Sequence, residues 1–243
     1  DDAASHGADA VILADIGLLD YAAQEHPDLR RHLSVQASAS NPEAINFYVD
    51  TFGVQRVVLP RVLTIPEITK LNKLINVQTE VFAFGGLCVM AEGRCALSSY
   101  VTGQSPNTNG VCSPACAVRY EDEGDRLVSR LADFTINTFA PGEAAGYPTL
   151  CKGRFIANGK TSYLFEDPVS LNAATMLQDL AAAGVSGLKI EGRQRGKAYV
   201  AKVVTSFRRS IDSTHDSNVE VDDLISVTEG QRRTAGAYDK TWR

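Results

Sequence analysis

The sequence lacks a long hydrophobic run. No apolar stretch approaches the roughly 20 residues that a helix needs to cross a bilayer, and no signal-peptide pattern opens the chain. We therefore expect a soluble, cytoplasmic protein. The chain begins at Asp1, without a methionine, and its first residues resemble the end of a helix. This predicts that an amino-terminal part of the protein is missing.

The sequence also lacks an excess of positive charge. Its formal net charge is −5, from 24 Lys and Arg against 29 Asp and Glu. A general attraction of the whole surface for polyanions is therefore not expected, and the charge predicts no nucleic-acid partner. A local basic patch is still compatible with this balance.

Several familiar catalytic motifs are absent. There is no G-x-G-x-x-G phosphate loop, no H-E-x-x-H zinc helix and no recognisable Ser/His/Asp set. The four histidines lie away from the cysteines in the sequence and show no metal-ligand spacing; they are His6, His26, His32 and His215. These absences argue against a Rossmann-type dehydrogenase, a zinc peptidase and a serine hydrolase.

Strand-like and helix-like segments alternate over the first 84 residues. Short runs rich in β-branched residues predict strands at 8–15, 33–37, 56–60 and 78–84. Amphipathic stretches with capping residues predict helices at 16–26, 41–53 and 64–75. This alternation is typical of a parallel sheet or a β/α barrel. The predicted fold class is α/β, a TIM-like β/α barrel that lacks its amino-terminal βα units and carries a cysteine-bearing insertion.

The remaining sequence divides by pattern into further segments. After the partial barrel of 1–84, residues 85–168 form the predicted insertion, with a hairpin whose tip is Asn158-Gly159. Residues 169–216 predict a closing helix, strand and helix, the first helix running from Ser170 to Gly184. Residues 217–243 predict a tail docked on the rest of the chain.

Charged residues follow several predicted strands, at the end where α/β folds place their functional groups. Lys189 and Glu191 alternate onto one face of a strand, and we expect them to pair. The candidate catalytic or donor-binding residues are Lys189, Glu191, Arg193, Arg61 and Glu80. The alternatives are structural ion pairs and, for Glu80, hydrogen bonds to the amides of the following loop.

The five cysteines lie between residues 88 and 151, in glycine-rich sequence after a predicted strand. Their spacing is Cys88-x6-Cys95-x16-Cys112-x3-Cys116, followed by Cys151. No C-x2-C pair of the zinc-knuckle or ferredoxin type is present. The residues alone therefore leave three possibilities, which are an iron–sulfur cluster, a zinc site and unligated thiols.

A longer pattern surrounds the first two cysteines. Glu80-x-Phe82-x2-Gly85-Gly86-Leu87-Cys88-x4-Gly93-x-Cys95-x-Leu97-Ser98 resembles the signature of the collagenase-like peptidase family of unknown catalytic type. Gly86 stands where that family usually has Ser or Ala, a change that we expect only to loosen the turn. Other segments, among them GYPTLCKGRF and KIEGRQRGKAYV, resemble the branch of the family that serves ubiquinone biosynthesis.

The resemblance implies a cofactor and its ligands. Members of the family are similar in a β/α-barrel core and an iron–sulfur cluster held by cysteines. Carried onto this chain, a 4Fe–4S cluster would be bound by Cys88, Cys95, Cys112 and Cys151. Cys116 is the alternative ligand, because RNA-modifying relatives have a C-x3-C at this place.

The resemblance also implies a function. The chain is expected to be the iron–sulfur subunit of an oxygen-independent, anaerobic hydroxylase of ubiquinone precursors. It would act in a heterodimer with a UbiV-like protein, with prephenate as hydroxyl donor and a lipid-carrier protein bringing the quinone precursor. Whether this subunit is catalytic or only a scaffold stays open. The alternatives are a tRNA or rRNA hydroxylase of the same family, or a peptidase as the family name implies.

Overall fold

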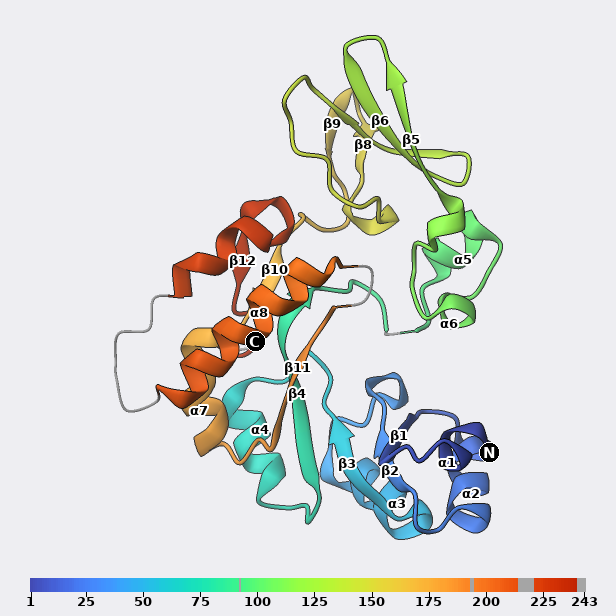
Figure 1. The fold of residues 1–243 in the computed structure, drawn as a ribbon, viewed down its shortest axis with the longest axis vertical. Coiled ribbons are helices and arrows are strands. Elements are labelled where there is room, and N and C mark those ends of the chain that lie inside the picture. The colour runs from blue at the N-terminus through green and yellow to red at the C-terminus, as the bar shows by residue number, and fades with distance from the viewer. Residues whose placement is uncertain (92, 193–194, 214–220, 240–243) are drawn as a thin grey trace. The chain divides into compact units, whose positions relative to one another are not determined.

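The computed structural model describes residues 1–243 except 92, 193–194, 214–220 and 240–243. The chain forms two compact units (Figure 1). Unit 1 comprises Asp1–Gly85, Ser170–Val227 and Arg233–Arg243, and unit 2 comprises Gly86–Val169 and Thr228–Arg232. Each unit is described by itself.

Unit 1 is a mixed α/β unit built on a seven-stranded sheet. The strand order is β1-β2-β3-β4-β10-β12, with β11 also paired to β4. The strands are β1 Ala10–Leu13, β2 Arg30–Leu33, β3 Val54–Val58, β4 Gln78–Gly86, β10 Ser170–Asn172, β11 Gly187–Ile190 and β12 Arg233–Thr234. The pairs β1–β2, β2–β3, β3–β4, β4–β11 and β10–β12 are parallel. The predicted α/β class with a parallel sheet is confirmed.

Helices connect these strands. The α-helices of unit 1 are α1 Asp2–Ser5, α2 Ile16–Glu25, α3 Pro42–Phe52, α4 Ile65–Asn72, α7 Leu177–Ala182 and α8 Lys197–Asp212, and its 3-10 segments are η1 Val35–Ala37, η4 Ala174–Met176 and η5 Val221–Val227. The predicted caps Asn41 and Thr64 are present, because their side chains accept hydrogen bonds from the first turns of α3 and α4. Asp15, which was predicted as the end of a strand, caps α2 in the same way. The sequence-based starts of these helices are therefore confirmed.

Strand β4 is the centre of unit 1. Its residues from Thr79 to Gly85 are almost fully buried, as expected of a strand covered on both faces. Ala83 and Phe84 pack with Val203 and Phe207 of α8 in one hydrophobic cluster. Burial of a side chain as large as Phe84 contributes about 1.5–3 kcal/mol. The strand is thus a rigid support for the residues that it carries.

The second strand differs from the prediction. Residues 33–37 were predicted as a strand, but β2 is Arg30–Leu33, and Val35–Ala37 form a 3-10 turn. The strand was missed because it contains Arg30, Arg31 and His32, of which the last two are buried. The third strand is also shifted, from 56–60 to Val54–Val58.

The segment after residue 169 differs as well. Ser170–Asn172 form strand β10 rather than the first turn of a helix, and α7 begins only at Leu177. The predicted docking of the tail is confirmed for its described part. Tyr238 is buried, and its hydroxyl donates a hydrogen bond of 2.5 Å to the carbonyl of Phe82 in β4.

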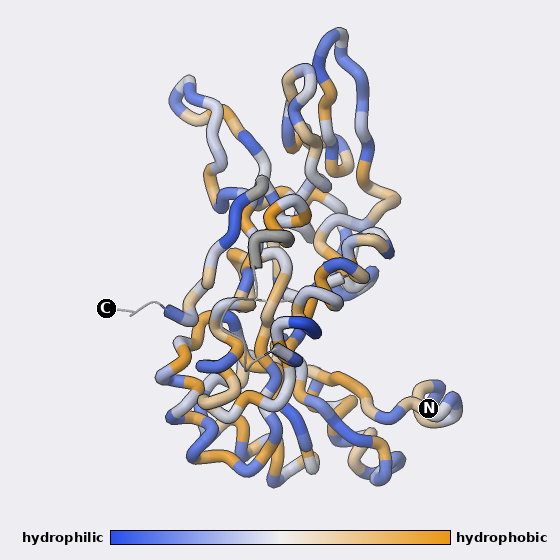
Figure 2. The backbone as a smooth tube through the Cα atoms, turned by 60° about the vertical axis from the view of Figure 1, so that its left-hand side comes forward, coloured by the Kyte–Doolittle hydropathy of each residue, from blue (hydrophilic) through white to orange (hydrophobic). Residues whose placement is uncertain are grey.

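Unit 2 is built from short elements. Its helices are α5 Ala96–Thr102 and α6 Pro106–Asn109, its strands are β5 Val118–Glu123, β6 Arg126–Leu131, β7 Phe134–Phe139, β8 Arg154–Ala157 and β9 Lys160–Tyr163, and its 3-10 turns are η2 Ala115–Ala117, η3 Leu150–Lys152 and η6 Glu229–Gln231. Strands β5, β6 and β7 form one antiparallel sheet, and β8 and β9 form the predicted hairpin. Figure 2 colours the turn between β5 and β6 hydrophilic, in keeping with its run of acidic residues.

A small core holds unit 2 together. Val101, Leu131 and Ile136 are buried against one another, and Leu150 packs on them. The core therefore joins α5, the antiparallel sheet and the turn η3. Within the described part of the chain, no helix is long and apolar enough to cross a membrane.

Candidate functional site

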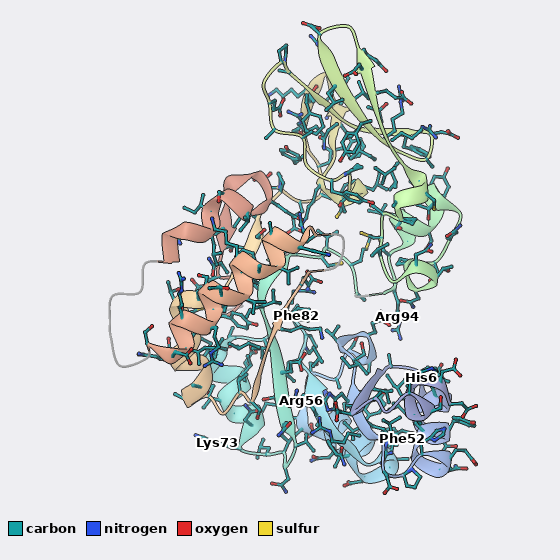
Figure 3. All side chains as sticks on the ribbon, in the orientation of Figure 1. His6, Phe52, Arg56, Lys73, Phe82 and Arg94 are labelled. Carbon is teal, nitrogen blue, oxygen red and sulfur yellow. The ribbon has the colours of Figure 1, made fainter. Side chains whose placement is uncertain are left out.

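A layer of charged residues crosses the parallel sheet of unit 1. Glu80 of β4 is buried and forms ion pairs with two cationic side chains on neighbouring strands. Its Oε2 lies 3.4 Å from the Arg56 guanidinium of β3, and its Oε1 lies 3.1 Å from Lys189 Nζ of β11. Figure 3 labels Arg56. In the sheet register Arg56 lies opposite Gln78 and Lys189 lies opposite Phe82, so both cations reach Glu80 diagonally across the neighbouring strands.

His32 of β2 extends the same layer. It lies opposite Arg56 in the β2–β3 register and is 7% exposed. Burial lowers the pKa of His32, and the positive charges of Arg56 and Arg30 lower it further. The imidazole is therefore neutral at pH 7. Neither His32 nor Arg56 was among the predicted site residues, and the signal that was available is that each directly precedes the apolar end of its strand, Leu33 in β2 and Val57 in β3.

A second ion pair lies closer to the carboxyl ends of the strands. The Arg61 guanidinium lies 3.5 Å above the centre of the Phe82 ring, and it contacts Glu191 Oε1 at 3.0 Å. Gly85 has a φ of 140°, and a Cβ there would lie 2.6 Å from the Cβ of Glu191. The glycine of the family motif is therefore required for Glu191 to lie against β4.

The predicted pairing of Lys189 with Glu191 is corrected by these contacts. Lys189 takes Glu80 as its partner, and Glu191 takes Arg61. Four of the five predicted catalytic or donor-binding residues thus lie together in unit 1. The fifth, Arg193, lies outside the described residues.

The cysteine-bearing segments lie together in unit 2. Cys95 caps helix α5, where its sulfur accepts a hydrogen bond of 3.4 Å from the amide of Ser98. The Ser98 hydroxyl donates a hydrogen bond of 2.5 Å to the carbonyl of Cys112. Ser98, the last residue of the family motif, therefore joins the second cysteine to the third.

Cys151 reaches the same place from a later segment. Its turn, η3, packs against α5, and the Tyr147 hydroxyl donates a hydrogen bond of 2.9 Å to the carbonyl of Ser113. These contacts fasten residues 147–152 to the segment that carries Cys112. The fold of unit 2 thus brings the segment of Cys151 against the segments that carry the other cysteines, although Cys151 is distant from them in the sequence.

The thiols influence one another electrostatically. Burial raises the pKa of Cys112, and the neighbouring Cys95 and Cys88 raise it further. Burial likewise raises the pKa of Cys151 to about 12, with Lys152 opposing the shift and Cys112 and Cys88 adding to it. Cys112 and Cys151 thus each lie within electrostatic reach of Cys88, and thiols gathered in this way are a donor set that a thiolate-binding cation would neutralise.

Cys116 lies within η2 and is exposed, as is Cys88, whereas the other three cysteines are partly buried. Among the described residues, no three His, Cys, Asp or Glu side chains are already arranged as they would be around a bound metal ion. Thiols are the donors that an iron–sulfur cluster takes, so the residue types fit a cluster, and the predicted ligands stay a prediction.

A shallow hollow runs along helix α8. It is lined by Arg195, Lys197, Val200, Ala201, Val204 and Thr205. Two of these residues are cationic and precede or begin the helix, where the helix dipole also attracts anions. The hollow is thus a local basic feature in a chain whose net charge is negative.

Residues 1–236 match the family described as Peptidase family U32. The chain is 31% identical to the tRNA hydroxylation protein P of Escherichia coli strain K12 over 243 residues, covering 92% of this chain and 53% of that protein. A protein of the same name from Haemophilus influenzae is 31% identical over 225 residues, covering 84% and 48%.

A third relative is named for a different RNA, the 23S rRNA. The Escherichia coli 23S rRNA 5-hydroxycytidine synthase is 28% identical over 225 residues, covering 93% of this chain and 29% of that protein. The chain spans about half the length of the tRNA hydroxylation proteins that it matches. No solved structure gives a significant match.

These relatives overturn the assignment to ubiquinone biosynthesis. The expected identity, the ubiquinone biosynthesis protein UbiU, is wrong, and so is the predicted hydroxylation of ubiquinone precursors, because the relatives are named for hydroxylation of RNA. The ubiquinone assignment rested on other segments, among them GYPTLCKGRF and KIEGRQRGKAYV, whereas the motif from Glu80 to Ser98 indicated only the family. The UbiV-like partner and the lipid carrier followed from that assignment and are not carried further.

Proposed function

The chain belongs to peptidase family U32, and from that premise we propose that it is the iron–sulfur-binding part of an RNA hydroxylase acting on tRNA. The support comes from relatives at 31% identity that are named for tRNA hydroxylation. Hydroxylation of rRNA is the second candidate, because a relative at 28% identity is named for it. The proposal reverses the expectation that no nucleic acid is bound, and it places the protein in the cytoplasm.

The proposed cofactor is a 4Fe–4S cluster. The observation that supports it is the joining of three cysteine-bearing segments through Ser98, Tyr147 and the packing of η3 on α5. Cys88, Cys95 and Cys112 would hold the cluster, with Cys151 as fourth ligand and Cys116 as the alternative. When bound, such a cluster supplies electron transfer or a coordination site for oxygen. The chain's own contribution is to bring distant thiols to one place.

The charged layer of unit 1 is the proposed site of the hydroxyl donor. Arg56, Arg61 and Lys189 supply three positive charges against the two carboxylates of Glu80 and Glu191. A partly buried excess of positive charge favours an anionic ligand, and guanidinium groups bind carboxylates well. A dicarboxylate such as prephenate therefore suits the layer.

The reaction balances if the hydroxyl donor is reduced as the nucleobase of the RNA is oxidised. A C–H bond of the base would become C–OH, with loss of two electrons. A C–OH bond of the donor would break in exchange, and the donor would take up the two electrons and the proton.

The proposed architecture is part of a TIM-like β/α barrel. Strands β1, β2, β3, β4 and β11 are joined by parallel pairing in that order, as are successive barrel strands. In this proposal residues 1–84 and 169–216 belong to the barrel. Residues 85–168 are then the cluster-binding insertion, and residues 217–243 are the tail.

The experiment that tests the function is nucleoside analysis. The gene is deleted in its own host. Nucleosides from purified tRNA and 23S rRNA are then separated by chromatography, and are identified and quantified by mass spectrometry. We expect a hydroxylated nucleoside to disappear from tRNA and to remain unchanged in rRNA. Reintroduction of the wild-type gene should restore it, whereas a Cys112→Ser gene should not.

Two outcomes would overturn the proposal. Unchanged nucleosides in both RNAs would refute RNA hydroxylation. Loss of a hydroxylated nucleoside from 23S rRNA alone would replace tRNA by rRNA as the substrate.

A further inference from the structure

A buried ion pair lies beside Cys151. The Lys152 ammonium contacts the Glu229 carboxylate, and the two side chains are 8% and 20% exposed. Both residues belong to unit 2, although 77 positions separate them in the sequence. A buried lysine requires such a partner, because an unpaired buried charge is costly. The pair therefore fastens residue 229 to the turn that carries Cys151.

The same ion pair touches the start of the loop that carries Cys88. A Cβ placed on Gly86 would lie 3.2 Å from Lys152 Nζ and 3.2 Å from Glu229 Oε1. Such distances are tighter than ordinary van der Waals contact. The glycine at this position therefore does more than loosen the turn, because it leaves room for the ion pair two residues before Cys88.

The segment 228–232, here called the strap, is held closely against unit 2. Gly230 has a φ of 56°, and a Cβ there would lie 2.4 Å from the carbonyl oxygen of Pro168. The amide of Glu166 donates a hydrogen bond of 3.1 Å to the carbonyl of Cys151. The strap and the turn of Cys151 are thus packed on the same short stretch, residues 166–168.

We propose that Lys152 and Glu229 are positioning residues that hold Cys151 beside Cys88, and that Cys151 rather than Cys116 completes the ligand set. This inference rests on the proposed iron–sulfur cluster. Lys152 also places a positive charge next to a thiolate ligand. A cluster held by four thiolates is anionic, so a neighbouring cation favours its reduced form and raises its reduction potential.

The test uses the full chain, reconstituted anaerobically with iron and sulfide. The variants are Lys152→Met, Glu229→Gln and the conservative Lys152→Arg. The matched control is Arg232→Gln, which removes an ion pair between the same strap and Asp167 (2.6 Å) that is exposed to solvent. Iron per chain, resistance to a chelator and the reduction potential are measured for each.

The expected results follow from charge and position. Lys152→Met should release iron to a chelator roughly 10-fold more readily, as for other outer-shell substitutions at metal sites, and should lower the reduction potential. Glu229→Gln should raise the potential, because the lysine loses its counter-charge. Lys152→Arg should restore the potential, and Arg232→Gln should match wild type. A purely structural pair would change the stability of the chain without moving the potential in opposite directions.

A second measurement needs no cluster. The iron-free chain is treated with dibromobimane, which bridges neighbouring thiols, and the bridged Cys88–Cys151 peptide is quantified by mass spectrometry. We expect this bridge in wild type and Arg232→Gln, and several-fold less of it in Lys152→Met and Glu229→Gln. Circular dichroism identifies a variant that fails to fold. If Lys152→Met fails to fold, the yields of the bridged peptide from Lys152→Arg and Glu229→Gln are compared with that from wild type.

The outcomes separate the two proposals. Equal bridging in all variants overturns the positioning role, even if wild type binds iron. A wild-type chain that takes up no iron overturns the cluster, while bridging still decides the positioning role. Iron retained by Cys151→Ser but lost from Cys116→Ser would transfer the ligand role to Cys116 and refute the inference.

Discussion

At the scale of single residues, Arg31 explains why a buried strand escaped prediction. Its guanidinium donates hydrogen bonds of 2.8–3.3 Å to five backbone carbonyls, those of Ala22, His26, Pro27, Leu29 and Phe52. These carbonyls satisfy the charge, so that a strand beginning Arg-Arg-His is buried at little cost. Sequence patterns count such residues as exposed, because they contain no information on distant carbonyls.

Replacement of Arg31 by lysine should therefore destabilise the protein. Lysine keeps the charge but lacks the planar fork of donors, so several buried carbonyls lose their partner. We expect Arg31→Lys to lower the free energy of unfolding by about 2 kcal/mol, measured by urea denaturation with circular dichroism. Arg30→Lys is the control, because Arg30 is exposed and makes a hydrogen bond of 3.4 Å to Asp9. Equal effects of the two substitutions would contradict this account.

Several charged residues of the candidate site could be predicted from the sequence, but their partners could not. Alternation placed Lys189 and Glu191 on one face of a strand. The end of a strand pointed to Arg61, and Glu80 was singled out within the strand that precedes the cysteine-bearing loop. The partners were not predictable, because they depend on which strand lies next to which and at what register. Cys116 is the signal that favoured RNA over ubiquinone, since its C-x3-C spacing resembles the RNA-modifying relatives.

At the scale of elements, helix α4 shows where prediction succeeds. The start of α4 is determined by the four consecutive residues 64–67, because Thr64 and Glu67 form a complete capping box. Turn and cap signals are local, so the sequence contains all of the interaction. Residues 170–172 show the contrary case. They were predicted as the start of a helix but pair with the sheet, a choice made by non-local neighbours.

The capping box gives a prediction with a pH dependence. Thr64→Ala should lower the free energy of unfolding by about 1 kcal/mol at pH 7. Hydrogen bonds from Thr64 lower the pKa of Glu67 in the folded state, so this contribution is present above the ordinary Glu pKa of about 4.3 and fades as the pH falls through the lowered value. Thermal unfolding at pH 7 and at pH 3 measures the change.

Thr69→Ala is the control for that prediction. Thr69 lies in the same helix, and its hydroxyl donates to the carbonyl of Ile65 without capping the helix. Its effect should be smaller and should not change over the same pH range. A Thr64→Ala effect that is independent of pH would contradict the role given to Glu67.

At the scale of the whole molecule, the five thiols all belong to unit 2, whereas the charged layer belongs to unit 1. A ligand that binds only the folded form of one unit stabilises that unit. Removal of iron by an anaerobic chelator should therefore increase amide hydrogen exchange in α5 and around Cys151, by more than in β2 and β3. Exchange that rises equally in both units would contradict the placement of the cluster on the thiols of unit 2.

The small space at Gly86 has a consequence for the evolution of this chain. Because a Cβ at position 86 would lie 3.2 Å from Lys152 Nζ and from Glu229 Oε1, closer than ordinary van der Waals contact, a substitution at any one of the three positions affects which residues the other two tolerate. Homologous chains with Ser or Ala at position 86 should therefore carry a shorter or uncharged side chain at position 152 or 229. The three positions are expected to change together, although the sequence separates the first from the last by more than half its length.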